Sequence, residues 1–245
     1  MLRLSSLHLV CSKEELEYLP EGKILINTIN AHSYNLAQKD KEFAEALALG
    51  DFLIPDGQSI VKACKWLKGN SLPKERIAGW DLFSFEMNRL NQEKGKRVVM
   101  FLGSSESVLK MIVRQVSVDY PNLEAVTYSP PFKSTFSDED SRAMTDAINQ
   151  ANPDLLWIGM TAPKQEKWTY LHWKELDINC HVGTIGAVFD FYAGTVKRAP
   201  LWMQRHALEW LFRLYGQPGK MWRRYLIGNP LFLWNIIKEK NNKKI

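Results

Sequence analysis

The sequence predicts an α/β protein with a doubly wound, mostly parallel, Rossmann-like sheet and a basic, helical C-terminal appendage. The clearest observation is the run RVVMFLG at residues 97–103, which is almost continuously apolar, as parallel strands covered on both faces are. A second run of this kind, DLLWIGM, lies at residues 154–160. Segments of helix length separate such runs, and this alternation is typical of right-handed crossovers in a parallel sheet.

Taken in order, strands and helices alternate through the first 195 residues. Short apolar runs predict strands at residues 23–30, 51–57, 97–103, 123–129, 154–160 and 178–183. Apolar residues at helical spacing predict helices at residues 32–49, 59–67, 80–92, 104–120 and 138–151, and another from residue 163. We therefore divide the chain into an α/β core, residues 1–195, and a helical appendage, residues 196–245.

Composition is that of a protein with a substantial core. The chain has 245 residues, of which 45% are hydrophobic, so it can bury a core without disulfides or a structural metal. Its three cysteines, Cys11, Cys64 and Cys180, lie far apart with no C-x-x-C spacing. We expect neither a zinc site nor a redox pair, and the odd number of cysteines fits a reducing cytosol.

Charge is distributed unevenly. Residues 196–245 contain 11 Lys and Arg against 2 Asp and Glu, whereas residues 1–195 contain 21 against 25. The same C-terminal stretch interleaves its basic residues with four tryptophans, Trp202, Trp210, Trp222 and Trp234. This combination suits an anionic membrane surface, although single-stranded nucleic acid and simple packing on the core are alternatives.

The most apolar run of the appendage, residues 225–237, has 13 residues, and a spanning helix needs about 20. We therefore expect peripheral contact with a membrane surface and no nucleic-acid partner.

Small and polar residues follow the predicted strands. Ligands of open parallel sheets bind at the carboxyl ends of the strands, so these positions are candidates for a site, although ordinary turns use the same residues. No G-x-G-x-x-G or G-x-x-x-x-G-K-[ST] pattern is present, which argues against a dinucleotide dehydrogenase and a P-loop enzyme. The strand-end candidates are Thr28, Asn30, Asp56, Gly57, Gly103, Ser104, Ser105, Gly159, Thr161, Gly183, Thr184 and Gly186.

Asp56 and Arg76 are the most informative charged residues of the core. Asp56 lies in a Pro-Asp-Gly turn after a strand, where its carboxylate can point into a cleft and accept a proton; the alternative is an Asx-turn. Arg76, in PKERIAGWD, can clamp a phosphate or form an ordinary surface ion pair.

Metal chemistry is poorly supported by the sequence. The five histidines show no metal-binding spacing, and Asp138 and Asp140, which form a D-x-D pattern, stand where a helix is predicted to begin. We interpret these acidic residues as a solvated helix start and expect neither a metal nor another cofactor.

Several motifs together resemble the WecG/TagA/CpsF family of bacterial glycosyltransferases along nearly the whole chain. The stretches that carry the resemblance are INTINAHS, DFLIPDG, ERIAGWDL, VVMFLG, LLWIGMTAPKQEKW, GTIGAVFDFYAGTVKRAP and LEWLFRL. The resemblance implies an inverting, metal-independent glycosyltransferase on the cytoplasmic face of the cell membrane. Such an enzyme moves a sugar from a UDP donor onto a polyprenyl-diphosphate-linked saccharide for a cell-surface polysaccharide.

The resemblance also implies roles for individual residues. Asp56 matches the general base of the family, and Thr28 and Asn30 match the strand-end pair beside it, which makes Asp56 and Thr28 the catalytic candidates. Lys220 departs from the arginine that is usual in the family, and Gln217 replaces a common acid. The donor-binding candidates are Asn30, Arg76, Gly103, Gln165, Gly183, Gly186, Arg213, Lys220 and Arg223.

Two alternatives to transfer stay open at this point. One is a basic nucleotide- or lipid-binding module without catalysis, and the other is an enzyme that modifies a nucleotide sugar, which the missing dinucleotide pattern disfavours. The sequence does not distinguish N-acetylmannosamine, its uronic acid and glucose as the transferred sugar. It also leaves the oligomeric state open, a homo-oligomer included.

Overall fold

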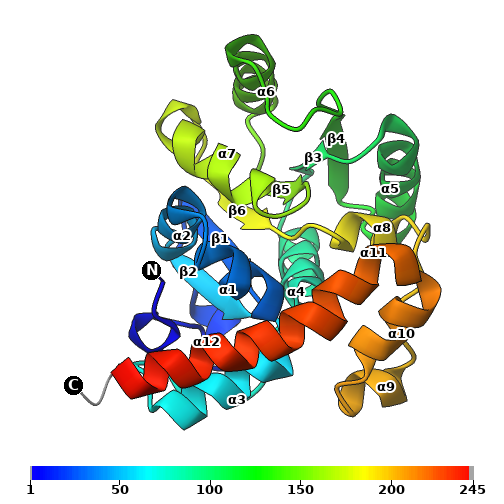
Figure 1. Cartoon of the computed structure of the whole chain (residues 1–245). Helices are drawn as coiled ribbons and strands as arrows, with labels where there is room; N and C mark the ends of the chain where they lie inside the picture. Colours follow the sequence, from blue (N-terminus) through cyan, green and yellow to red (C-terminus); the bar gives the residue numbers. More distant parts are fainter. Residues whose placement is uncertain (1, 243–245) are drawn as a thin grey trace.

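Six parallel strands form a single sheet at the centre of the protein, in the order β2-β1-β6-β5-β3-β4 (Figure 1). The computed structural model describes residues 2–242, apart from the side chain of Lys220. Every strand pair is parallel, which confirms the predicted doubly wound, Rossmann-like sheet. The strands are β1 (Ile24–Ile29), β2 (Phe52–Pro55), β3 (Arg97–Gly103), β4 (Leu123–Tyr128), β5 (Leu155–Gly159) and β6 (His181–Thr184).

The apolar run of β3 is explained by its two buried faces. Val99 and Phe101 pack into an apolar cluster with residues of α4 and α5, whereas Met100 and Leu102 pack into another with residues of α6 and α7. Successive side chains of a strand point to opposite faces, so a strand covered on both sides is apolar at every position.

The helices connect and cover these strands. They are α1 (Ala31–Ala37), α2 (Lys41–Ala48), α3 (Gln58–Leu67), α4 (Gly79–Gln92), α5 (Glu106–Asp119), α6 (Asp138–Ala151), α7 (Lys164–His172), α8 (Val188–Tyr192), α9 (Leu201–Arg205), α10 (Glu209–Gly216), α11 (Pro218–Trp222) and α12 (Gly228–Asn242). Short 3₁₀ turns lie at Leu4–Ser6, Lys13–Tyr18 and Trp173–Glu175, and a π-helical turn, Arg223–Ile227, joins α11 to α12. Within residues 2–242 no helix combines the length and the apolar character needed to cross a bilayer.

Two predicted helices are each divided in the structure. The helix expected at residues 32–49 is α1 and α2, because the Asp40 side chain caps a new helix by accepting a hydrogen bond from the Phe43 N–H at 3.0 Å. The helix expected from Pro200 to Gly216 is α9 and α10, separated at Ala207, whose φ of 57° is left-handed. The predicted helix start at Asp138 is confirmed, with Ser137 and Asp140 forming a capping box.

The last helix packs deeply against the core. Phe232 and Ile236 are buried in one apolar cluster with side chains of α1 and α3, and Figure 1 shows α12 running past both helices. The buried Glu239 carboxylate accepts hydrogen bonds from the Leu4 N–H at 2.9 Å, the Ser5 N–H at 2.8 Å and the Tyr34 hydroxyl at 2.7 Å. Both apolar burial and a charged hydrogen-bond network therefore attach α12 to the N-terminal part of the chain.

A buried Glu–His pair supports the opposite edge of the sheet from the strand ends. His181, the first residue of β6, faces Glu86 Oε1 at 2.9 Å through Nδ1 and the Pro20 carbonyl at 2.9 Å through Nε2. Because both ring nitrogens face acceptors, the doubly protonated imidazolium satisfies the site best. Burial opposes this charge, but the bond to Glu86 outweighs it and raises the pKa of His181 above its ordinary 6.5.

We predict a loss of stability at alkaline pH that depends on His181. A raised folded-state pKa stabilises the protein fully below about pH 6.5, and this contribution disappears as the pH rises through the folded value. Urea unfolding of the wild type between pH 6 and 9 should show this decline, and His181→Gln should lack it. The exposed His8→Gln variant is the control. Parallel stability curves for the wild type and His181→Gln would contradict the prediction.

Candidate active site

Asp56 lies where the carboxyl ends of β1 and β2 meet. Its backbone N–H donates to the Ile29 carbonyl at 2.8 Å, so the residue after β2 is tied to the end of β1. Thr28 is paired in register with Ile54, two positions before Asp56. Asn30 follows β1, and a Cβ on Gly57 would lie 3.8 Å from its Cβ. The structure thus brings Thr28, Asn30 and Asp56 together at one edge of the sheet, although they come from different strands.

Asn30 also begins helix α1. Its side-chain oxygen accepts hydrogen bonds from the His32 N–H at 3.0 Å and the Ser33 N–H at 3.1 Å, which fixes the amide beside the strand end. His32 is half-buried, and burial, followed by the charge of Arg224, lowers its pKa to about 4. Its imidazole is therefore neutral at pH 7 and contributes no positive charge to the site.

Three arginines face Asp56 from two distant parts of the chain. Arg76 precedes α4, Arg213 lies on α10, and Arg224 lies in the π-helical turn before α12. Burial raises the pKa of the Asp56 carboxyl, and the three arginine charges oppose this rise. The carboxylate keeps partial contact with solvent, so it is held among cations without being sealed from a ligand.

The C-terminal segment also brings a carboxylate to this site. Glu209, the first residue of α10, forms an ion pair with Arg76 Nη1, and the side chains are 26% and 19% exposed. Arg198 stacks on the Trp80 ring, with its guanidinium carbon 4.6 Å from the ring centroid, and interacts electrostatically with Glu209, Arg76 and Arg213. Four arginines therefore face two carboxylates, and this excess of positive charge suits an anionic ligand.

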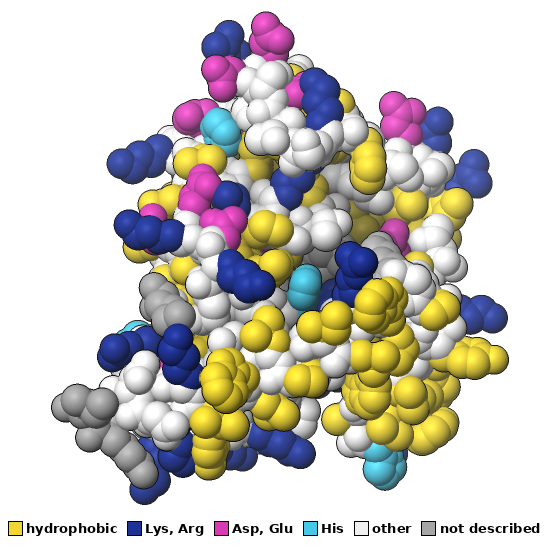
Figure 2. Space-filling view, in the orientation of Figure 1, with side chains coloured by type: hydrophobic (Ala, Val, Ile, Leu, Met, Phe, Trp, Pro, Cys, Tyr) yellow, Lys and Arg dark blue, Asp and Glu magenta, His cyan; other side chains and the backbone are white. Residues whose placement is uncertain are grey.

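Basic side chains are visible at this place on the surface. Figure 2 shows Lys and Arg side chains beside a hollow in the middle of the face, between the C-terminal helices and the strand ends. The hollow is thus bordered by the core on one side and by the C-terminal segment on the other.

Gln165 is held rigidly at the ends of β5 and β6. This buried side chain of α7 accepts from the Met160 N–H at 3.1 Å and donates to Glu166 Oε1 at 2.9 Å. Burial raises the pKa of Glu166 to about 7. Gly186, whose φ is 51°, lies beside it, because a Cβ there would be 3.6 Å from Gln165 Oε1. A fixed amide and an accessible backbone turn therefore face each other at this edge.

Close packing accounts for two of the candidate glycines without a ligand. A Cβ on Gly183 would lie 2.2 Å from Cζ3 of Trp157, the large buried side chain of β5. A Cβ on Gly103 would lie 2.5 Å from the Gly159 carbonyl oxygen, and its φ of 119° favours glycine as well. Both glycines allow neighbouring strands to end close together.

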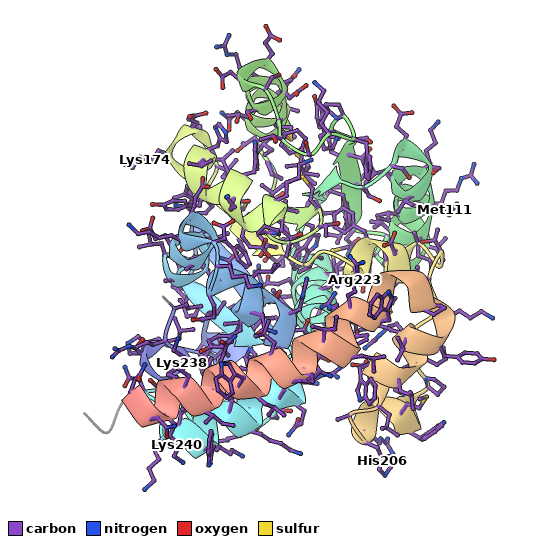
Figure 3. The ribbon with its side chains drawn as sticks, in the orientation of Figure 1. Met111, Lys174, His206, Arg223, Lys238 and Lys240 are labelled. Atoms are coloured by element: carbon purple, nitrogen blue, oxygen red, sulfur yellow. The ribbon has the colours of Figure 1, made fainter. Side chains whose placement is uncertain are left out.

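The candidate cations of the appendage lie in different environments. Arg213 belongs to the group around Asp56, whereas Arg223 is exposed and lies over the Trp222 ring, 5.2 Å from its centroid. Figure 3 shows Arg223 at the junction of α11 and α12. Lys220 lies in α11, but its side chain is outside the described part of the structure.

Sequence reasoning missed four residues of the site: Arg224, Arg198, Glu209 and His32. A signal for one of them exists, since Glu209 precedes Arg213 by one helical turn and a lone acid among many cations is unusual. The preference for Arg224 over its neighbour Arg223 depends on the π-helical turn, which the sequence does not indicate. Within residues 2–242, no group of three or more His, Cys, Asp or Glu side chains is arranged to hold a metal ion.

Comparison with known proteins gives a consistent result. The model of the glycosyl transferase WecG/TagA/CpsF family matches residues 8–245. An N-acetylglucosaminyldiphosphoundecaprenol N-acetyl-beta-D-mannosaminyltransferase of Bacillus subtilis (strain 168) is 33% identical over 220 residues, which are 90% of this chain and 81% of that protein.

Proteins of the same name from two other bacteria are also similar. The protein of Bacillus spizizenii (strain ATCC 23059 / NRRL B-14472 / W23) is 31% identical over 92% of this chain and 84% of its own length. The protein of Staphylococcus aureus (strain MW2) is 26% identical over 91% of this chain and 83% of its own length. With a family match from residue 8 to residue 245, this chain belongs to the WecG/TagA/CpsF family and is a glycosyltransferase.

Proposed function

We propose that this enzyme transfers N-acetylmannosamine from a UDP donor to N-acetylglucosamine linked to undecaprenyl diphosphate, with inversion and without a metal. The sugar and the acceptor come from the names of the similar proteins. The observation that carries the chemistry is the half-buried carboxylate of Asp56 among Arg76, Arg213 and Arg224. This arrangement supports transfer over a binding module or an epimerase, because it combines a base with an anion site and lacks a dinucleotide pattern.

Asp56 is the general base of the proposed reaction. It takes the proton from the acceptor hydroxyl while that oxygen attacks the anomeric carbon on the face opposite the UDP group. The bond from the anomeric carbon to the UDP oxygen breaks, so the configuration inverts. Burial raises the pKa of Asp56, which makes it a stronger base than a solvated aspartate, while the arginines favour its ionised form. Thr28 and Asn30 border the carboxylate and orient the reacting groups.

The leaving UDP is stabilised by cations rather than by a metal. Negative charge grows on the diphosphate as the glycosidic bond breaks, and prearranged guanidinium groups in a partly dry site stabilise it strongly. Arg76, Arg213 and Arg224 lie near the base and are the principal candidates. Lys220 and Arg223 are further proposed ligands of the donor, and Gln165, Gly186, Gly183 and Gly103 border its site at the ends of β3, β5 and β6.

The proposed lipid-linked acceptor requires contact with a membrane surface. The C-terminal segment exposes many large apolar side chains, among them Leu201, Trp202, Leu211, Tyr215, Trp222, Leu226, Ile227, Leu233, Trp234 and Ile237. The core contributes to the same surface, since Lys240 lies 4.0 Å from the centroid of the exposed Trp66 ring of α3. Exposed lysines on α3 (Lys62, Lys65) and α12 (Lys238) adjoin them. We propose peripheral binding to the cytoplasmic face of the membrane.

Asp56→Asn should lower turnover about 10²–10⁴-fold while UDP binding is retained, because only proton transfer is lost. Transfer from UDP-N-acetylmannosamine to a short-chain lipid-diphosphate acceptor is measured by mass spectrometry, and this assay also tests the proposed function. The exposed Asp146→Asn variant of α6 is the control. Near-normal turnover in a folded Asp56→Asn protein would exclude Asp56 as the base.

Transfer should survive exhaustive treatment with EDTA, because the proposed counter-charges of the diphosphate are arginines. The same assay is run before and after chelation. Activity that disappears with EDTA and returns with Mg²⁺ or Mn²⁺ would show that a metal takes part.

Leu233→Glu combined with Trp234→Glu should weaken binding to phosphatidylglycerol vesicles, because these side chains are 61% and 65% exposed on α12. Added salt should weaken binding further, since the Debye length falls from about 10 Å at 0.1 M to about 3 Å at 1 M. Transfer to a soluble short-chain acceptor should not change. Met111→Glu is the control, since Figure 3 shows this exposed residue on α5, away from α12. Unchanged vesicle binding in the double variant would rule out α12 as a membrane contact.

A further inference from the structure

One ion pair joins the core to the C-terminal segment at the candidate site. Arg76 Nη1 donates to Glu209 Oε2, although the two residues lie 133 positions apart in the chain. Among residues 2–242, no hydrogen-bond acceptor takes the remaining nitrogens of Arg76. A guanidinium has five N–H donors, so Arg76 can keep its bond to Glu209 and still bind an anion.

Glu209 also reduces a repulsion that the site would otherwise contain. Arg198 is close enough to Arg76 and Arg213 for their charges to act on it, and Arg213 acts on Arg224 in the same way. The C-terminal segment has two acidic residues, and the other, Glu239, is bound to Leu4, Ser5 and Tyr34. Glu209 is therefore the carboxylate with which this segment offsets the positive charge around Asp56.

We propose that Glu209 is a positioning residue for the transfer reaction. It orients the guanidinium of Arg76 toward the diphosphate of the donor, and it holds α10, and with it Arg213, against the core beside Asp56. The inference rests on the proposed function, and nothing in that function requires Glu209 to touch a substrate. Its carboxylate stays bound to Arg76 when the donor enters, because the other donors of Arg76 are free to bind phosphate oxygens.

The charge of Glu209 also reaches the base. The groups that act on Asp56 are Arg76 from the segment before α4, Arg213 and Glu209 from α10, and Arg224 from the turn before α12. Burial raises the pKa of Asp56 and Glu209 adds to this rise, while the arginines oppose it. Replacing Glu209 by an uncharged residue therefore lowers the pKa of Asp56, and the acidic limb of the pH profile moves to lower pH.

The test compares Glu209→Gln, Glu209→Asp and a matched control in the full chain. Glu139→Gln is the control, because Glu139 also lies in the first turn of a helix, α6, and is exposed on the surface. The measurements are kcat and KM for UDP-N-acetylmannosamine with a short-chain acceptor between pH 4 and 9, and calorimetric binding of UDP.

Glu209→Gln should lower kcat/KM about 10–100-fold, mainly through a higher KM, weaken UDP binding, and move the acidic limb to lower pH. Glu209→Asp keeps the charge on a shorter side chain, so it should leave the limb in place and lose less of kcat/KM. Glu139→Gln should behave as the wild type.

Three outcomes would overturn the inference in distinguishable ways. A wild type that neither binds UDP nor transfers the sugar removes the proposed function, and the inference with it. A wild type that transfers, with the same kcat/KM and acidic limb in Glu209→Gln, removes the inference alone. Equal losses in the Gln and Asp variants with an unmoved limb would reduce Glu209 to a structural contact. If Glu209→Gln does not fold, wild-type kcat/KM and UDP binding in Glu209→Asp would be sufficient to reject the role.

Discussion

The candidate site depends on the attachment of the C-terminal segment to the α/β core. The core provides Asp56 and Arg76, while Arg198, Arg213 and Arg224 all come from the last fifty residues. Two contacts of different kinds fix this segment: α12 packs through Phe232, Ile236 and Glu239, and α10 is held by the ion pair of Glu209 with Arg76. Because the segment is attached on both sides of the π-helical turn, its arginines reach the base in a defined arrangement.

The arrangement concentrates positive charge, which has a cost without a ligand. Guanidinium groups that approach one another in a partly buried site repel, and their desolvation adds to the penalty. Asp56 and Glu209 offset part of it, and stacking of Arg198 on Trp80 lets its charge lie against an apolar ring. What remains is an excess of positive charge beside a carboxylate. A diphosphate fits such a site, because it supplies the missing negative charge without displacing the base.

The same segment gives the site its proposed relation to a membrane. Its inward side carries the arginines, and its outward side exposes apolar residues such as Trp202, Leu226 and Trp234. Two opposite demands are therefore met by one short stretch of helices, since a helix presents different side chains to its two sides. An enzyme built in this way would complete its anion site next to the surface where a lipid-linked acceptor lies.

The sequence by itself determined all six strands, their parallel arrangement and the position of Asp56 at a strand end. Strand periodicity and turn chemistry are local properties, so they can be read from neighbouring residues. Local pattern also marked Arg76 and Arg213. The tertiary structure decided where the long helices break, that α12 packs into the core, and that Arg224, Arg198 and Glu209 join the site. These features depend on contacts between residues more than one hundred positions apart, such as Arg76 with Glu209 and Tyr34 with Glu239, and no local pattern specifies such pairs.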